Sequence, residues 1–322
     1  MTSRTALALG DAATPTHCQP AQRRTVITSD GVALSVSDLC TTSPVTHTVV
    51  ALHGLCLTRQ SWYRPAQRFR RPGIRVIQYD HRGHGRSDGA PLHTYTPERL
   101  AQDLAEVLTA LQVSGPLILA CHSMGGATAL RYLARPVEQQ PVRPDGLVLV
   151  ATWAGNLTEH GLARLLALPG IDTAMALAQH VPHMRSERVM RSLARPLCEF
   201  VTHDKAVSAS LSQAFRSTPT STALGFLHSL KTFDQRDVLP TISAATTVIS
   251  GGVDLLTPPA HSEEMAAAIV GATHIHLPEA GHMLLQEAAS IVGKAILRTI
   301  DNLEPAEQAP NPNALKDIAT SA

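Results

Sequence analysis

The chain has 322 residues, of which 44% are hydrophobic and 16% charged, and its formal net charge is +1. This length and apolar content suffice for a large core, and a near-zero charge without a basic run argues against an electrostatic nucleic-acid site. No stretch of about 20 apolar residues is present, so we expect no membrane-spanning helix and no integral association with a membrane.

The ends of the chain and its cysteines bear on location. The N-terminal stretch MTSRTALALG has too short an apolar run for a secretory signal, which needs roughly 7–15 apolar residues. The five cysteines are scattered and odd in number, which favours reduced thiols and a cytoplasmic location over a disulfide framework. Residues 1–22 and 304–322 could bury little apolar surface, so we expect two flexible terminal segments.

Short apolar runs dominate the first half of the chain and return near its end. Asp30-Gly31 separates two β-rich runs and predicts a hairpin. The runs that follow are continuously apolar, as strands of a sheet covered on both faces must be. They lie at 47–54, 74–80, 116–123, 145–152, 246–252 and 273–281.

Helical patterns separate these predicted strands. Thr96 is a candidate N-cap, with Pro97 at the first position of a helix that reaches residue 113. Thr257 precedes Pro258 in the same way, and a last helix is expected over 283–300. Strands that alternate with helices predict an α/β fold with a mostly parallel open sheet and helices on both faces.

The strand rhythm stops between residues 153 and 232, where short amphipathic patterns are interrupted by prolines. We interpret 153–232 as a helical cap inserted over the ends of the strands. Residues 23–152 and 233–303 would then form one core domain.

Ser123 is the first candidate catalytic residue. It lies between the predicted strand LILACHS and the predicted helix MGGATALRYLA, and Gly125 and Gly126 permit close packing there. A sharp strand-to-helix turn lifts one side chain above the sheet edge, whereas an ordinary turn serine has no such context. Alternation along the strand directs His122 away from Ser123 and leaves Cys121 buried, so neither is expected to be the base or the nucleophile.

These residues resemble the α/β-hydrolase superfamily over roughly residues 24–303. C-H-S-M-G around Ser123 is similar to the nucleophile elbow G-x-S-x-G, with Cys121 in place of the first glycine. ALHGLC resembles the His-Gly oxyanion loop of the family. The resemblance implies that the backbone N–H groups of Leu55 and Met124 bind the oxyanion.

The resemblance also implies the remaining members of a catalytic triad. PEAGHMLL places His282 after the last predicted strand, and SGGVDLLTP places Asp254 after the preceding one. The order Ser123…Asp254…His282 is that of the family. His282 would be the base, Asp254 would orient it, and Ser123 would form an acyl-enzyme.

Cofactor and metal sites are not expected. DHRGHGRSDG resembles the D-x-x-G-x-G-x-S loop of the family and also mimics a dinucleotide fingerprint, but Asp88 stands where the third glycine should be. The sixteen histidines include no H-E-x-x-H or H-x-x-E-H spacing. His53 is interpreted as a residue that shapes its loop.

The expected function is therefore cofactor-free hydrolysis of a carboxylic ester with an apolar moiety. DHRGHGRS and HSMGG are similar to the carboxylesterase and monoacylglycerol-lipase-like members. Hydrolysis of a C–C bond or a lactone, and perhydrolysis, remain alternatives for the same triad, as does a non-catalytic small-molecule receptor. The identity of the substrate, the residues that bind it and the oligomeric state are not indicated by the sequence.

Overall fold

The computed structural model describes residues 22–40, 44–170, 173, 202 and 205–303. The two terminal segments expected to be flexible lie outside these residues, except for Gln22. Much of the middle of the predicted cap also lies outside them.

Eight strands form one sheet in the order β1-β2-β4-β3-β5-β6-β7-β8. Their bounds are β1 Gln22–Ile27, β2 Ala33–Cys40, β3 His47–Leu52, β4 Ile74–Tyr79, β5 Leu117–His122, β6 Gly146–Val150, β7 Ala245–Gly251 and β8 Thr273–Leu277. β1 and β2 pair antiparallel as the predicted hairpin, β2 joins β4 antiparallel, and all other pairs are parallel. The mostly parallel α/β sheet is thus confirmed.

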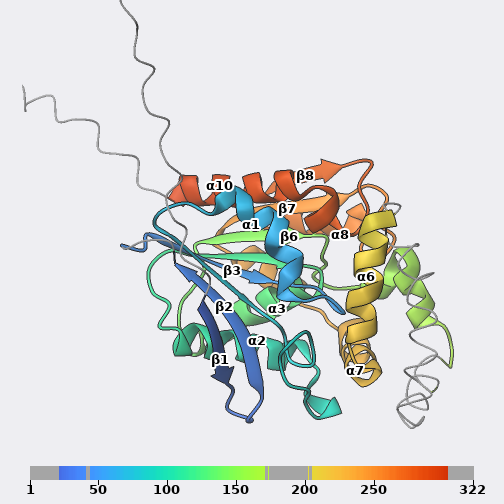
Figure 1. The fold of residues 1–322 in the computed structure, drawn as a ribbon. Helices are drawn as coiled ribbons and strands as arrows, with labels where there is room; N and C mark the ends of the chain where they lie inside the picture. The colour runs from blue at the N-terminus through green and yellow to red at the C-terminus, as the bar shows by residue number, and fades with distance from the viewer. Residues whose placement is uncertain (1–21, 41–43, 171–172, 174–201, 203–204, 304–322) are drawn as a thin grey trace, which may run out of the picture.

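Helices cover both faces of the sheet (Figure 1). They are α1 Tyr63–Phe69, α2 Pro97–Ala110, α3 Met124–Leu133, α6 Lys205–Ser217, α7 Thr220–Lys231, α8 Pro259–Ala268, α9 Leu284–Glu287 and α10 Ala289–Leu303. Short 3₁₀ helices lie at Arg59–Trp62, Leu92–Thr94, Val137–Gln139, Leu157–Glu159, Gly161–Ala167 and Arg236–Thr241.

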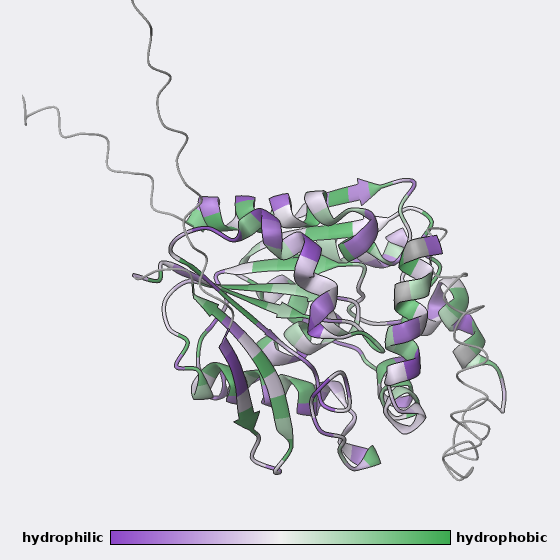
Figure 2. Ribbon diagram, in the orientation of Figure 1, coloured by the Kyte–Doolittle hydropathy of each residue, from purple (hydrophilic) through white to green (hydrophobic). Residues whose placement is uncertain are grey.

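Two apolar clusters form the core, one on each face. α2, α3 and α8 bury one cluster, and α1 and α10 bury the other. Figure 2 shows the central strands mainly in hydrophobic colours, while β1 at the edge begins in hydrophilic colours and turns hydrophobic only at its end. The continuously apolar runs therefore occupy the strands that are covered on both faces.

Two predicted helix boundaries were wrong. Thr96 caps α2 as expected, since its side chain accepts a hydrogen bond from Arg99 N. Thr257, however, does not cap α8, which begins at Pro259, because its hydroxyl is used elsewhere. The last expected helix is interrupted at Ala288, which separates α9 from α10.

The parallel strands end at one edge, where the candidate site residues lie. Ser123 follows β5, Asp254 follows β7 by three residues, and His282 lies on the loop after β8. α6 stands beside this edge in Figure 1. None of the helices in the described ranges has both the length and the apolar composition needed to cross a bilayer.

Candidate active site

Ser123 occupies a sharp turn between β5 and α3. Its φ of +51° is rare for a residue with a side chain and costs of order 1–3 kcal/mol. Two hydrogen bonds hold the turn: Ser123 N–H donates to the Val150 carbonyl at 3.0 Å, and the Thr152 hydroxyl donates to the Ser123 carbonyl at 2.8 Å. Strand β6 and the residues after it thus hold the backbone of Ser123 in this strained conformation.

The two glycines after Ser123 are required by close packing. A Cβ atom on Gly125 would lie 2.4 Å from the Leu52 carbonyl oxygen, and one on Gly126 would lie 2.3 Å from the Thr152 hydroxyl oxygen. Side chains do not tolerate such distances, so α3 could not approach β3 and the loop after β6 with larger residues here. The sequence interpretation of HSMGG therefore has a direct steric basis.

Ser123, His282 and Asp254 form one hydrogen-bonded chain. His282 Nε2 lies 3.1 Å from Ser123 Oγ, and His282 Nδ1 lies 2.8 Å from Asp254 Oδ2. The Asp254 carboxylate can only accept, so Nδ1 carries the proton and Nε2 presents its lone pair to the serine. This geometry is suited to removal of the Ser123 proton.

Asp254 is buried and accepts hydrogen bonds from three further donors besides His282 Nδ1. Leu256 N–H and Thr257 N–H donate to its Oδ1 at 2.8 and 2.9 Å, and the Thr257 hydroxyl donates to Oδ2 at 2.8 Å. Burial raises the pKa of the Asp254 carboxyl, but His282 and these hydrogen bonds outweigh it and lower the pKa below its usual value. The group therefore remains an anion beside the imidazole.

Thr257 is a site residue that the sequence interpretation missed. Besides its bond to Asp254, its hydroxyl lies 3.2 Å from His282 Nδ1. The spacing of three residues from Asp254 was visible in the sequence, but the following prolines gave Thr257 the signature of a helix cap.

The predicted oxyanion loop passes directly beside Ser123. A Cβ on Gly54 would lie 3.1 Å from Ser123 Cβ and 2.9 Å from His122 Nδ1, so Leu55 begins within reach of the serine. Met124 is the first residue of α3, and its N–H has no acceptor within the helix. Gly54 and Met124 thus both lie next to Ser123, and the assignment of Leu55 and Met124 as oxyanion donors stays a prediction.

Two neutral histidines hold the oxyanion loop. His53 Nε2 accepts from the His81 N–H at 2.9 Å, while its Nδ1 bonds the Gly54 carbonyl at 2.8 Å. His84 Nε2 accepts from the Cys56 N–H at 3.1 Å. Burial lowers the pKa of His53 to about 4 and that of His84 to about 3, which keeps both rings able to accept. His53 therefore shapes its loop, as expected.

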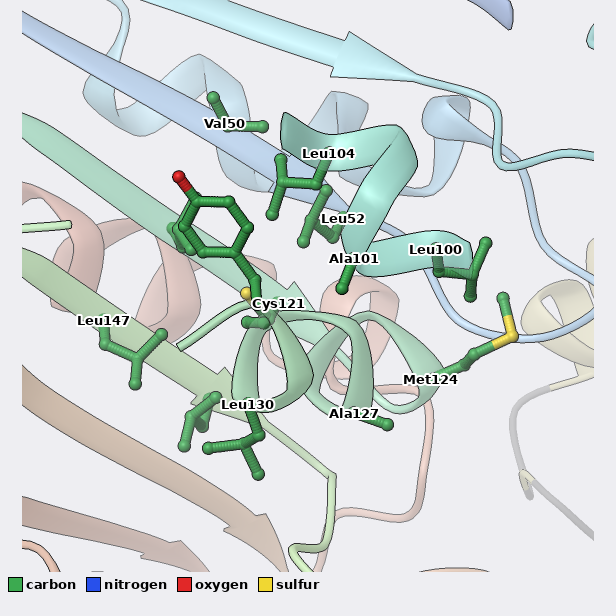
Figure 3. Packing of buried hydrophobic residues seen from close by; sticks show 14 of the residues in the cluster. Val50, Leu52, Leu100, Ala101, Leu104, Cys121, Met124, Ala127, Leu130 and Leu147 are labelled. Carbon is green, nitrogen blue, oxygen red and sulfur yellow. The ribbon is translucent and has the colours of Figure 1, made fainter. Parts of the chain in front are cut away.

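His122 and Cys121 lie on opposite faces of β5, as alternation predicted. Cys121 is buried among apolar side chains that include Leu52 and Leu147 (Figure 3), and burial raises the pKa of its thiol well above the usual value. His122 Nε2 instead bonds the backbone carbonyl of His282 at 2.9 Å. This link between β5 and the loop of the candidate base was not foreseen.

A metal site is not formed by the histidines in the described ranges. His274 and His276 both bond the Ser250 hydroxyl, at 2.9 and 3.1 Å. Among described residues, no group of three potential ligands could hold a metal ion.

Known proteins with similar sequences and structures include several hydrolases. AB hydrolase superfamily protein YisY of Bacillus subtilis (strain 168) is 27% identical over 274 residues, which cover 84% of this chain and 96% of that protein. A non-heme chloroperoxidase of Streptomyces lividans is 36% identical over 127 residues, or 39% of this chain and 44% of the relative. A thermophilic esterase from Thermogutta terrifontis has a TM-score of 0.70 at 25% identity, covering 88% of this chain and 99% of that one.

The family model described as serine aminopeptidase, S33, matches residues 43–289, well over half of the chain. This match agrees with the sheet order and with the strand–turn–helix geometry at Ser123. The chain therefore belongs to the serine aminopeptidase S33 family within the α/β-hydrolase superfamily.

Proposed function

We propose that the chain is a cofactor-free serine hydrolase that cleaves a carboxylic ester with an apolar moiety. The observation that carries this proposal is the chain of two hydrogen bonds, 3.1 and 2.8 Å long, from Ser123 through His282 to Asp254. Ser123 is the nucleophile, His282 the general base, and Asp254 the residue that orients the imidazole and stabilises its positive charge.

The reaction has two steps. His282 Nε2 takes the Ser123 proton as Oγ attacks the ester carbonyl, and the N–H groups of Leu55 and Met124 stabilise the oxyanion, each donor being worth about 10²–10³ in rate. The C–O bond then breaks, and His282 protonates the leaving alcohol. Water, activated by the same imidazole, releases the acid from the acyl-enzyme and restores Ser123.

The preference for an apolar moiety is supported by the side chains beside the catalytic loops. Leu57 follows the oxyanion loop and Met283 follows His282, and both belong to one buried apolar cluster with Val207 and Leu211 of α6. We propose that residues 153–232 form a cap over the core made of 23–152 and 233–303. The scattered cysteines support a cytoplasmic location.

A fluorophosphonate probe tests the mechanism, because it modifies only a serine that is activated as a nucleophile. We expect labelling of Ser123 that is abolished in Ser123→Ala and unchanged in Ser217→Ala, an exposed serine on α6. Absence of labelling in the folded wild-type protein would refute the proposed function and favour a non-catalytic receptor.

A substrate panel separates esterase activity from the other reactions open to this triad. Acyl esters of increasing chain length and a monoacylglycerol test ester cleavage, a lactone tests ring opening, and a peracid assay with added hydrogen peroxide tests perhydrolysis. The proposal requires that a linear ester have the highest kcat/KM. A higher value for a lactone or a C–C substrate would reassign the reaction while leaving the triad in place.

A further inference from the structure

A cavity of about 860 Å³ lies apart from the candidate catalytic residues. It is bounded by the segment before and within α1, by the face of β2 and β4 on the α1 side, and by α6. Leu57 and Gln286 line it, and these two residues are near in sequence to the oxyanion loop and to the His282 loop. Ser123 does not line it, nor does either of its two partners.

The charges around this cavity are of one sign. Arg23, Arg59 and Arg64 line it, and none of the described lining residues is an aspartate or a glutamate. Arg23 and Arg64 are exposed, and neither makes an ion pair with a residue in the described part of the chain. Arg59 is ion-paired with Asp80, so the positive potential that attracts anions comes mainly from Arg23 and Arg64.

Arg59 is the most rigid of the three. Its Nη1 donates to Asp80 and to the Ser35 hydroxyl, the latter at 3.0 Å, and its side chain is only 11% exposed. These bonds use one nitrogen, so Nε and Nη2 keep their N–H groups without an acceptor among the described residues. A guanidinium fixed on one side and unpaired on the other is suited to bidentate binding of a carboxylate or phosphate.

Two polar groups at the bottom of the cavity also lack partners. Gln78 Nε2 and Ser61 Oγ are buried and form no hydrogen bond with a described residue. Gln78 lies on β4 directly opposite Ser37 of β2, and both line the cavity. A buried donor without an acceptor costs about 1–3 kcal/mol, a cost that the oxygen atoms of a ligand would remove.

The wall formed by α6 has a different character. Val207 and Leu211 line the cavity there, together with Leu57. We propose that this cavity is an accessory binding site for a small organic anion, whose carboxylate or phosphate lies between the arginines and whose carbon skeleton contacts α6. The binding of an anion here does not depend on the proposed catalytic function, although Leu57, Val207 and Leu211 also belong to the apolar cluster beside the catalytic loops.

Calorimetric titration of the full chain at low ionic strength tests the site. Citrate and inorganic phosphate are the two probes, and glycerol is the uncharged comparator. We expect both anions to bind and glycerol not to bind; the tighter anion identifies the headgroup. Replacing two arginines in Arg23→Gln/Arg64→Gln should raise the Kd about tenfold, because charge-assisted hydrogen bonds are lost.

Two further variants locate the binding. Arg68→Gln/Arg298→Gln removes the same charge from exposed positions of α1 and α10 outside the cavity and should leave the Kd unchanged. Ser123→Ala should also leave it unchanged. The proposal fails if neither anion binds, if the distant pair of substitutions weakens binding equally, or if Ser123→Ala removes it, which would place the anion in the catalytic centre. Fluorophosphonate labelling of Ser123 in the wild-type protein tests the proposed catalytic function separately, because its result does not depend on whether the anion binds.

Discussion

Acidification should destabilise the fold through histidines that are buried without charge. Burial lowers the pKa of His53 to about 4 and the pKa values of His84 and His122 to about 3. In the unfolded chain a histidine has a pKa of about 6.5. Below that pH the unfolded chain binds protons that the folded chain does not, so the free energy of unfolding decreases as pH falls.

The magnitude follows from the pKa difference. One pKa unit corresponds to about 1.4 kcal/mol, so at about pH 5 each of these histidines lowers the free energy of unfolding by about 2 kcal/mol relative to neutral pH. A loss of about 2 kcal/mol is already a large fraction of the whole stability of an ordinary domain, about 5–15 kcal/mol. Asp254, whose pKa is lowered, contributes stability that is present above about pH 4 and lost only below it.

Urea unfolding followed by circular dichroism at about pH 7.5 and about pH 5 measures this difference. In His84→Gln, the difference between the two pH values should shrink by about 2 kcal/mol, because one titrating group is gone. His228→Gln changes an exposed histidine on α7 and should leave the difference unchanged. A wild-type difference below about 1 kcal/mol would refute the assignment of neutral, buried rings.

Three further predictions concern catalysis. Asp254→Asn should lower kcat/KM by about 10⁴ with an unchanged circular dichroism spectrum, since the amide favours the wrong imidazole tautomer; near-normal turnover would reassign the acid. Cys121→Gly should retain activity in the ester assay, whereas a large loss would mean that the thiol shapes the elbow. His122→Phe should lower kcat about tenfold with little change in KM, because the His282 loop loses one anchor, and unaltered kcat would show the hydrogen bond to be dispensable.

Some features were predictable because they depend on residues that are adjacent in the sequence. The strand before Ser123, the glycines after it and the cap at Thr96 are local patterns with local causes. The chain order of Ser123, Asp254 and His282 followed from the family resemblance, and the parallel sheet brings the ends of their strands to one edge.

Other features depend on contacts between distant segments. His122 forms a hydrogen bond with the backbone carbonyl of His282, 160 positions later, and no local sequence pattern predicts this contact. Thr257 had the signature of a helix cap, but its hydroxyl donates a hydrogen bond to the nearby carboxylate of Asp254. The interruption at Ala288 likewise had no signal in the apolar periodicity of the last helix.

The histidines around the site have a common chemical advantage. An imidazole can accept with one nitrogen and donate with the other, whereas lysine and arginine can only donate. His53 and His84 use this property to accept backbone N–H groups of the loops around Leu55, so their protonation would break the bonds that position the oxyanion loop. Acid therefore acts on the proposed enzyme by withdrawing support from the donors that stabilise the transition state, once the buried rings of His53 and His84 become protonated.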